Sequence, residues 1–263
     1  MTVAERGDGV PLSLCVMSST RLTPHMLRLR LAGRDLAPYE DNRELHVRLY
    51  VPKLGRYEAV QQALRKKKAD PFLPASLAED IATRYYTLRR VNAREGWLDI
   101  DFVLHQPAGP GSSFALQARP GDICAISAPC GRGAQPAQRY LIAGDEAALP
   151  AIARIGESLP AEALGTILVE VASAEERVDF ATPPGVTLRW LYRNGLTTAS
   201  SPWLEAMVRE ELASWPAPDP SLFVWMAGEL SVASRLRPLL ANYKPQSLCV
   251  SYWRTGLSKD TAT

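Results

Sequence analysis

The hydrophobic pattern of this chain changes character once, near residue 137, and this change limits the available folds more than any other feature. From residue 11 to about residue 127, apolar residues alternate with polar ones, and Gly and Pro residues separate about six such runs. A period of two is typical of strands that bury one face. Because few helical segments interrupt these runs, the sequence predicts a small antiparallel barrel in the first half.

After a linker rich in Pro and Gly, residues 129–136, short apolar strands alternate with helices. We expect strands at 140–143, 166–172, 186–191, 222–226 and 248–253, and helices at 147–159, 202–213 and 231–240. This alternation predicts a parallel sheet covered by helices, in which ligands bind at the carboxyl ends of the strands. The predicted fold class is therefore β followed by α/β, with domains at residues 1–136 and 137–263.

A long segment, residues 53–83, interrupts the predicted barrel and is partly helical at 58–67. It is too long for a tight hairpin, and it carries three consecutive lysines, Lys66, Lys67 and Lys68. A lysine run in such a place is commonly a solvated loop. The alternative is a docking site for an acidic protein partner such as a ferredoxin.

The charge balance and the cysteine content exclude several classes of protein. The 30 basic and 28 acidic residues give a net charge of +2, which does not indicate a nucleic-acid partner. The 4 cysteines are scattered without a CxxC motif and there are 3 histidines, so no disulfide framework, zinc, iron–sulfur or haem site is expected. Residues 1–10 lack an apolar signal core and no apolar run reaches membrane-spanning length, so we expect a cytoplasmic protein without membrane insertion.

The most informative short motif is the run Arg84-Tyr85-Tyr86-Thr87 in a predicted strand. Alternate side chains of a strand share a face, so Arg84 and Tyr86 point one way and Thr87 the other. A cation, an aromatic ring, a hydroxyl and a backbone N–H in this arrangement suit a flavin, because they can bind its pyrophosphate, cover its ring and bond its N5 edge. A buried strand with a cross-strand tyrosine is the alternative explanation of the same motif.

A second segment follows the next predicted strand and opens a short helix. Gly109 and Gly111 would let the backbone approach an anion, and the helix start would favour negative charge with the aid of the Ser112 and Ser113 hydroxyls. The alternative is a Gly-rich turn before a capped helix, with His105 bonding a carbonyl at the strand end. Two flavin-compatible segments in one barrel favour the flavin hypothesis.

Acidic residues and glycines stand where strands of the second domain are expected to end. Such positions bind nucleotides in parallel sheets, and an acidic residue after the second strand commonly bonds a ribose 2′-hydroxyl. The motif differs from the Gly-x-Gly-x-x-Gly of dehydrogenases. The alternatives are helix caps at Asp145 and Glu229 and a solvent-facing strand end at Glu170. In chain order the residues are Gly144, Asp145, Glu146, then Glu170, and finally Gly228 and Glu229.

These segments occur in the order found in siderophore-interacting proteins, which the chain resembles over nearly its whole length. Phe114 stands where the family commonly has Trp, and Ala147 where it often has Thr. The resemblance implies a ferredoxin-reductase-like architecture, with an N-terminal FAD-binding barrel and a C-terminal nicotinamide-binding domain, and it adds Asp101 and His105 to the cofactor-binding residues. The matching segments are residues 31–36, 84–89, 101–105, 109–115, 144–152, 227–229 and 252–254.

The resemblance also implies an activity, which is the reduction of ferric siderophores with release of Fe(II). A reduced nicotinamide would deliver hydride to FAD, and single electrons would pass to Fe(III). Arg48 and Arg132 are expected to attract the anionic chelate, or else they are solvated surface cations. Glu170 would repel a 2′-phosphate and so favours NADH over NADPH, whereas Arg177 and Arg193 could pair with that phosphate.

Two other functions are compatible with these residues. One is flavin-dependent electron transfer with a protein, in which a ferredoxin is the partner or the electron donor. The other is non-catalytic binding of flavin or siderophore, which a loss of nucleotide binding at Ala147 would favour. A comparison of electron acceptors, and of flavin reduction by the two nicotinamides, separates the three functions.

Overall fold

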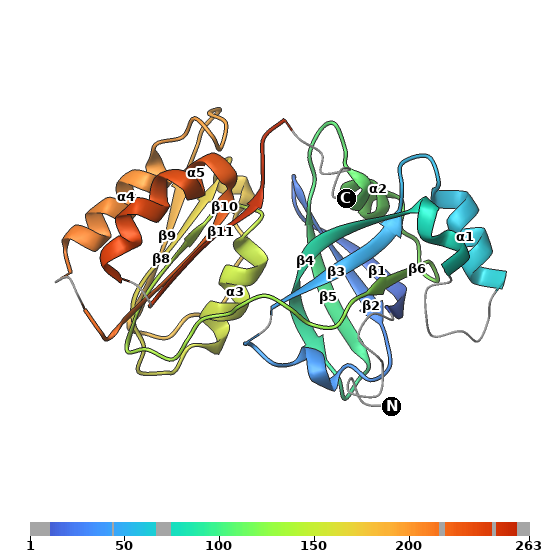
Figure 1. Cartoon of the computed structure of the whole chain (residues 1–263), viewed down its shortest axis with the longest axis horizontal. Coiled ribbons are helices and arrows are strands. Elements are labelled where there is room, and N and C mark those ends of the chain that lie inside the picture. Colours follow the sequence, from blue (N-terminus) through green and yellow to red (C-terminus); the bar gives the residue numbers. More distant parts are fainter. Residues whose placement is uncertain (1–10, 44, 67–74, 216–218, 244–245, 257–263) are drawn as a thin grey trace. The chain divides into compact units, whose positions relative to one another are not determined.

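The computed structural model describes residues 11–43, 45–66, 75–215, 219–243 and 246–256. The chain divides into two compact units, Met1–Arg132 and Gly133–Thr263, and each has its own sheet (Figure 1). The sequence-based boundary, after residue 136, falls in the same linker.

In the first unit, six strands of the described residues close into an antiparallel barrel, as the period of two predicts (Figure 1). Around the barrel they follow the order β1-β2-β5-β4-β3-β6. The strands are β1 (Leu12–Thr23), β2 (Met26–Ala32), β3 (His46–Pro52), β4 (Ile81–Asn92), β5 (Trp97–Val103) and β6 (Ile123–Ile126). The segments between them include the helices α1 (Tyr57–Lys66) and α2 (Pro110–Gln117) and the 3-10 turns η1 (Ala37–Tyr39) and η2 (Ala75–Asp80).

Apolar residues at every second strand position fill the barrel interior. Leu29, Leu49, Leu88, Ile100 and Phe102 are completely buried in one cluster. Each such side chain contributes roughly 1.5–3 kcal/mol on leaving water. If the pairing of two strands shifted by one residue, these apolar side chains would face solvent, so the alternation fixes the pairing register of the strands. It thereby also decides which residues of β3 and β4 face outward.

The long segment between β3 and β4 is held to the barrel by α1. The Gln61 side chain bonds the backbone of Ile123 in β6 as a neighbouring strand would. Its Nε2 donates to the Ile123 carbonyl and its Oε1 accepts from the Ile123 N–H, each at 2.8 Å. The Tyr57 hydroxyl and the Arg65 guanidinium both donate to the buried carboxylate of Asp122. The predicted helix at 58–67 is confirmed. Lys67 and Lys68 lie outside the described residues.

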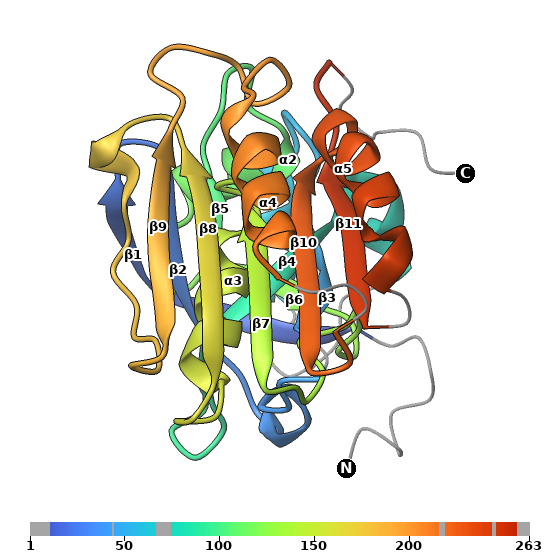
Figure 2. The same ribbon diagram turned by 90° about the vertical axis from the view of Figure 1, so that its left-hand side faces the viewer.

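The second unit is a parallel sheet with the strand order β11-β10-β7-β8-β9, which confirms the predicted α/β class. Helices α4 and α5 cover one face of the sheet and α3 lies on the other (Figure 2). The strands are β7 (Arg139–Gly144), β8 (Leu164–Val171), β9 (Val186–Tyr192), β10 (Leu222–Glu229) and β11 (Ser247–Trp253). The helices are α3 (Leu149–Ser158), α4 (Trp203–Ala213) and α5 (Leu230–Leu236), with 3-10 turns η3 (Ala174–Glu176) and η4 (Arg237–Tyr243).

The strand order reverses between β7 and β10. From β7 the chain passes outward to β8 and β9, and it then returns to the other side of β7 to form β10 and β11. Gly144 ends β7 and is the register partner of Ala227, next to Gly228 in β10. Open α/β sheets bind ligands at the carboxyl ends of the strands where the order reverses. This edge is therefore the candidate nucleotide site of the second unit.

Two kinds of feature are not found among the described residues. No helix there has both the length and the apolar character needed to cross a bilayer. No three His, Cys, Asp or Glu side chains there group in a way that could hold a metal ion.

Candidate cofactor and nucleotide sites

The two flavin-compatible segments of the barrel meet at Tyr86. Its ring packs on Phe102 of β5, with ring centroids 4.6 Å apart, and against the barrel core. Its hydroxyl reaches the first turn of α2, where a Cβ on Gly111 would clash with it. The close approach of β4 and α2 therefore requires glycine at position 111. The structure brings the Arg84–Thr87 motif and the Gly-rich turn into one place.

The start of α2 has backbone donors and no side-chain cap. Gly109 is the N-cap residue, and Pro110, which lacks an N–H, is in the first turn. The hydroxyl of Ser112 donates to the Val103 carbonyl at 3.0 Å, and that of Ser113 accepts from Gln117 Nε2 at 2.8 Å. The Ser112 hydroxyl thus fixes α2 to the end of β5, which corrects the prediction that it aids an anion. The other donors at this helix start are the backbone N–H groups of Gly111 and Ser112, which precede the first intrahelical bond and belong to buried residues.

The four residues of the β4 motif divide between the two faces of the strand. Arg84 lies on the same face as Tyr86 and donates from Nη1 to the Thr83 carbonyl at 2.8 Å. Tyr85 and Thr87 lie on the opposite face, where Thr87 is buried and Tyr85 is 64% exposed. The predicted division of Arg84 and Tyr86 from Thr87 is therefore present in the fold.

Two residues predicted to bind the cofactor have protein partners instead. Asp101 is 5% exposed and accepts two hydrogen bonds from Arg28 on β2, at 2.6 and 2.7 Å. A planar guanidinium–carboxylate pair of this kind occupies both oxygens, so the prediction for Asp101 is corrected to a cross-strand structural role. His105 Nδ1 lies 2.7 Å from the Pro107 carbonyl oxygen, which is the strand-end contact named as its alternative.

The remaining residues fit a flavin dinucleotide. An uncapped helix start offers N–H groups to a phosphate, a glycine lets the backbone approach closely, and Arg84 and Tyr86 supply a cation and an aromatic ring on one strand face. These are the groups with which a pyrophosphate and a flat ring system are held. The contact of Gly111 with Tyr86 is what brings the helix start and the strand motif together.

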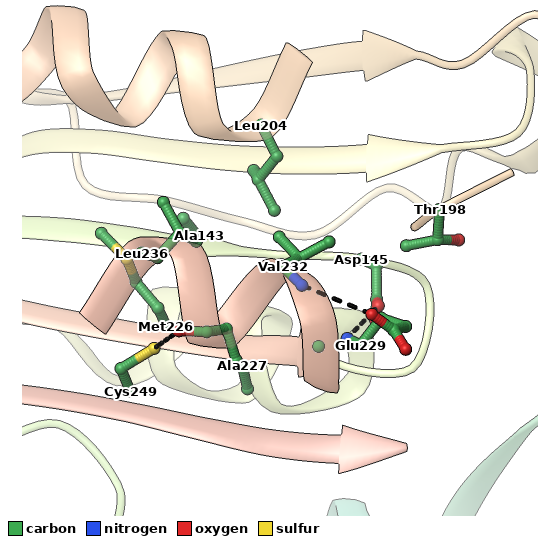
Figure 3. A pocket seen from close by; sticks show the side chains of 12 residues that line it. Ala143, Asp145, Thr198, Leu204, Met226, Ala227, Glu229, Val232, Leu236 and Cys249 are labelled. Atoms are coloured by element: carbon green, nitrogen blue, oxygen red, sulfur yellow. Dashed lines mark hydrogen bonds between the residues drawn. The ribbon is translucent and has the colours of Figure 1, made fainter. Parts of the chain in front are cut away.

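At the reversal point of the sheet, the carboxylate of Asp145 is buried and links the ends of β7, β10 and β11. Figure 3 shows Asp145 beside Glu229. One oxygen accepts from the Glu229 N–H at 2.9 Å and from the Trp253 indole at 2.8 Å, and the other accepts from the Ala147 N–H at 3.0 Å. Gly228 has a φ of +159°, and a Cβ there would lie 2.8 Å from the Asp145 Oδ2 atom. Burial, followed by the nearby Glu146 charge, raises the pKa of Asp145 to about 7.

Glu229 caps α5, as its alternative interpretation stated. Its Oε2 accepts from the Ser231 N–H at 2.5 Å and the Val232 N–H at 3.3 Å, and its Oε1 accepts from the Thr255 N–H at 3.1 Å. Burial opposes ionisation, but a hydrogen bond from the Ser231 hydroxyl, together with these backbone hydrogen bonds, outweighs it and holds the pKa of Glu229 below its usual value. Asp145 and Glu229 therefore organise the sheet edge, and their oxygens are already engaged.

A cavity of about 10 Å³ lies behind this edge and is lined mainly by apolar side chains, among them Ala143, Met226, Val232 and Leu236 (Figure 3). A cavity must have roughly this volume to hold one water molecule. It is a packing void between β10 and α5 and has no room for a nucleotide.

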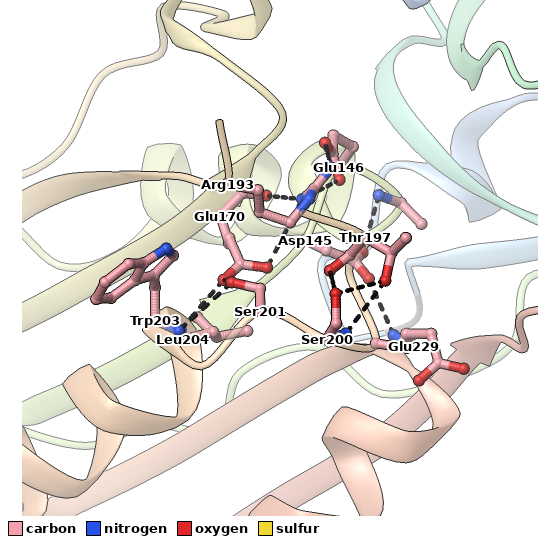
Figure 4. Close-up of polar contacts among 12 residues, drawn as sticks. Asp145, Glu146, Glu170, Arg193, Thr197, Ser200, Ser201, Trp203, Leu204 and Glu229 are labelled. Atoms are coloured by element: carbon pink, nitrogen blue, oxygen red, sulfur yellow. Dashed lines mark hydrogen bonds and ion pairs between the residues drawn. The ribbon is translucent and has the colours of Figure 1, made fainter. Parts of the chain in front are cut away.

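The ribose contact predicted for Glu170 is corrected by its surroundings (Figure 4). The residue is 1% exposed, and its Oε1 accepts from the Ser201 hydroxyl at 2.6 Å and the Leu204 N–H at 3.2 Å. Its Oε2 lies 3.7 Å from Arg193 Nη1. Burial raises the pKa of Glu170, against the effect of the Ser201 hydrogen bond and the Arg193 charge. Glu170 anchors the start of α4 and has no exposed oxygen for a ribose.

Arg193 is also engaged within the sheet edge (Figure 4). It is 7% exposed and pairs with Glu146 through both Nη atoms, while its Nε has no hydrogen-bond partner. Arg177 lies over the Trp190 ring, with its Cζ 5.5 Å from the ring centroid. A 2′-phosphate at Arg193 would have to displace the half-buried carboxylate of Glu146. The structure thus gives Glu170 and Arg193 protein partners in place of the ribose and 2′-phosphate contacts predicted for them.

The two arginines predicted to attract substrate both belong to the first unit. Arg48 is exposed on the outer face of β3, and its Nε donates to the Tyr85 hydroxyl at 3.0 Å. Arg132 is exposed and follows Cys130, whose backbone pairs with His46 of β3 at 2.7 and 2.9 Å. This pairing places the chain just before Arg132 at the start of β3, and Arg48 stands two residues into the same strand.

Sequence reasoning gave no role to Trp253 and Ser201, whose side chains hold Asp145 and Glu170. Trp253 stands in one of the segments on which the family resemblance rests, which was the available signal. No local pattern marks Ser201, because its partner is 31 residues away in the sequence.

Known proteins resemble both units. Residues 15–133 match the siderophore-interacting FAD-binding domain, and residues 137–256 match the siderophore-interacting protein family. The ferric vibriobactin reductase ViuB of Vibrio cholerae is 29% identical over 248 residues, which cover 91% of this chain and 88% of ViuB.

Solved structures agree with these matches. A siderophore utilization protein from T. fusca is 31% identical, with a TM-score of 0.77 over 94% of each chain. The siderophore-interacting protein SipS from Aeromonas hydrophila is also 31% identical, with a TM-score of 0.75 over 95% of this chain and 93% of SipS. The chain therefore belongs to the siderophore-interacting protein family, and its barrel is that family's FAD-binding domain.

Proposed function

We propose that this protein is a FAD-dependent oxidoreductase that reduces ferric siderophores with electrons from NADH or NADPH and releases Fe(II). The observation that carries the proposal is the junction of Tyr86 and Gly111, where an aromatic residue of β4 meets an uncapped helix start. Family membership supports the assignment of FAD to this junction. The 29% identity with a ferric vibriobactin reductase supports the reaction.

The chain's residues bind and orient the cofactor in this proposal. The N–H groups at the start of α2 and the Arg84 guanidinium neutralise the pyrophosphate, and Tyr86 covers the ring system. Thr87 supplies a hydroxyl and an N–H on the adjoining strand position. Bound FAD supplies the conversion between a two-electron hydride donor and the single electrons that Fe(III) accepts.

The second unit binds the nicotinamide nucleotide at the β7–β10 edge. Gly144 and Gly228 keep the strand ends free of side chains, so backbone N–H groups can approach phosphates. The caps at Asp145 and Glu229 hold the turns that present these groups. Because the Glu170 carboxylate is buried, cofactor choice falls to other contacts at this edge.

The ferric chelate is the substrate and needs no protein ligand to its iron. Hard oxygen donors hold Fe(III) more strongly than Fe(II), so reduction loosens the complex. Arg48 and Arg132 attract the chelate through its negative charge. The role of the protein toward iron is therefore to place a chelate near the reduced cofactor.

The test combines spectroscopy with single-turnover kinetics. The purified protein should show the absorption bands of oxidised flavin, lose them anaerobically with NADH or NADPH, and regain them with a ferric siderophore. A chromogenic Fe(II) chelator should report the released metal. Absence of flavin, or reduced flavin that a ferric siderophore does not reoxidise, would overturn the proposal. Faster reoxidation by an oxidised ferredoxin would assign the protein to electron transfer with a protein partner.

A further inference from the structure

Helices α3, α4 and α5 each begin near the carboxyl ends of the strands, against a buried carboxylate (Figure 4). Asp145 accepts from the Ala148 N–H, just before α3, at 3.3 Å. Glu170 accepts from the Leu204 N–H of α4 at 3.2 Å, and Glu229 caps α5. Helix starts at this edge commonly bind nucleotide phosphates in open α/β sheets. Here carboxylates of the protein bond some of those N–H groups and add negative charge to the edge.

The negative charges of this edge exceed its positive ones. With Glu146, the residues Asp145, Glu170 and Glu229 form a group that we call the edge carboxylates. In the described part of the chain, Arg193 is the cation that pairs with this group, because it bonds Glu146 and its Nη1 lies 3.7 Å from the Glu170 Oε2 atom. The Nε of the same guanidinium is buried without a hydrogen-bond partner, so it favours more negative charge nearby. The edge can therefore bind an anion, but only against its own excess of negative charge.

Asp145 is the edge carboxylate best placed to take up a proton. All of its hydrogen bonds come from neutral donors, and it has no cation as a partner among the described residues. Burial and the charge of Glu146 raise its pKa to about 7, whereas the hydrogen bonds to Glu229 lower the pKa of that residue. The charged and titratable groups of the surrounding elements are Glu146 before α3, Glu170 in β8, Arg193 after β9, Glu229 in β10, Tyr252 in β11 and Arg254 after it.

A proton on Asp145 must displace one of the donors that now bond its oxygens. Oδ1 accepts from the N–H groups of Ala147 and Ala148, and Oδ2 accepts from the Glu229 N–H and the Trp253 indole. Trp253 is the donor whose side chain is partly in solvent, at 36% exposure, while the other donors are backbone groups. Proton uptake therefore turns the indole N–H toward water and leaves the backbone of the edge in place.

We propose that an anionic nucleotide binds this edge together with a proton, which Asp145 takes up as the Trp253 indole is released. The inference rests on the proposed function and specifies how its nucleotide step responds to pH. The diphosphate of a dinucleotide adds negative charge to an edge where negative charge is already in excess, and nearby negative charge favours the protonated form of a carboxylate. Because such coupling is reciprocal, protonated Asp145 strengthens nucleotide binding in turn. Affinity should therefore fall as the pH rises through neutrality.

ADP-ribose is the probe, because it carries the diphosphate, undergoes no redox reaction and has no group that ionises near neutral pH. In calorimetric titrations of the full chain, its Kd should rise roughly three- to tenfold between about pH 6 and about pH 8.5, as expected for a partly screened charge interaction. The heat of binding should depend on the ionisation enthalpy of the buffer, because protons are taken up. Adenosine lacks the diphosphate, so its Kd should change less than about twofold. The 3 histidines of the chain all belong to the first unit and not to the unit that holds this edge.

Asp145→Asn removes the titrating group and should abolish both the pH dependence and the buffer-dependent heat. The matched control is Asp219→Asn, which changes a carboxylate before β10, at the opposite end of that strand, and should retain both. Thermal unfolding reports whether each variant folds. Trp253→Phe is a second test, because the loss of one donor to Asp145 raises the pKa of its carboxyl and should move the midpoint of the pH dependence upward. In the parent without nucleotide, the Trp253 indole N–H resonance should titrate with the midpoint of Asp145.

A Kd for ADP-ribose that ignores pH, the same pH dependence in folded Asp145→Asn, or an equal pH dependence for adenosine would overturn the inference. Failure to bind ADP-ribose at any pH would overturn it too. Anaerobic reduction of the flavin tests the proposed function separately. Flavin that NADH or NADPH reduces, with ADP-ribose binding independent of pH, would leave the reductase standing without the inference. Proton-linked binding in a protein whose flavin neither nicotinamide reduces would do the reverse.

Discussion

Gly111→Ala tests the junction on which the cofactor site rests. The glycine backbone there is not in the left-handed region, so alanine is compatible with the local conformation. The added methyl, however, would overlap the Tyr86 hydroxyl and lie 2.9 Å from Cζ of the same ring. Tyr86 cannot swing away freely, because its ring packs on Phe102 and the barrel core.

The expected change in the free energy of unfolding of Gly111→Ala follows from two opposing effects. Forcing an extra methyl group into a packed site costs about 1–3 kcal/mol. The gain of alanine over glycine in a helix is roughly 0.5–1 kcal/mol. We therefore expect Gly111→Ala to lower the free energy of unfolding by about 1–2 kcal/mol. Since Tyr86→Phe removes the overlapping oxygen, the loss should be markedly smaller in that background, giving a coupling between the two sites.

Urea unfolding of the four proteins, followed by circular dichroism, measures this coupling. Flavin titration of the same proteins should show FAD affinity reduced at least about fivefold in Gly111→Ala, which corresponds to about 1 kcal/mol. Gly109→Ala is the matched control, because its methyl would meet only the His105 ring at 3.6 Å and its effect should not depend on Tyr86. Equal destabilisation by Gly111→Ala in both backgrounds would refute the contact.

Three further outcomes are expected. Arg84→Ala should raise the Kd of FAD ten- to a hundredfold, since a charge-assisted phosphate contact contributes roughly 1.5–3 kcal/mol, and an unchanged fluorescence titration would remove Arg84 from the site. Glu170→Gln should destabilise the fold by about 1–3 kcal/mol while leaving the ratio of kcat/KM for NADH and NADPH unaltered, and a large change in that ratio would restore the ribose contact. Asp145 ionises near pH 4 in the unfolded chain and at about 7 when folded, so its contribution to stability should decline as pH rises from about 4 to 7, and this decline should vanish in Asp145→Asn. Identical urea midpoints against pH for both proteins would contradict the last expectation.

Periodicity was sufficient to predict the barrel and the parallel sheet. Alternation of apolar residues depends on neighbours two positions apart, and a helix pattern on neighbours three or four positions apart. The sequence therefore contained the classes and order of most elements, including the α1 helix inside the long segment. The Arg84–Thr87 strand and the Gly109–Ser113 turn were also found correctly as strand and helix start, because glycines and the strand pattern are local signals.

The functions expected of the acidic residues depended on contacts that the sequence does not display. Asp101 meets Arg28 from 73 residues away, and Asp145 meets Trp253 from 108 residues away. Glu170 was predicted to bond a ribose 2′-hydroxyl, but the hydroxyl of Ser201, just before α4, and the N–H of Leu204, in its first turn, bond its carboxylate instead. A carboxylate that cannot bond water is stable only when such donors surround it.

By itself, the sequence determined two successive patterns of burial, the glycines at the helix and strand ends, and the membership of a family. The tertiary structure alone decided which charged groups were already paired and which still faced outward. It buried Glu170 and Arg193 together, and it left Arg48 bonded to Tyr85 with no carboxylate partner among the residues that the structure describes. The physical reason is that burial patterns arise from residues close in sequence, whereas the partner of a charge is set by how distant strands are placed side by side.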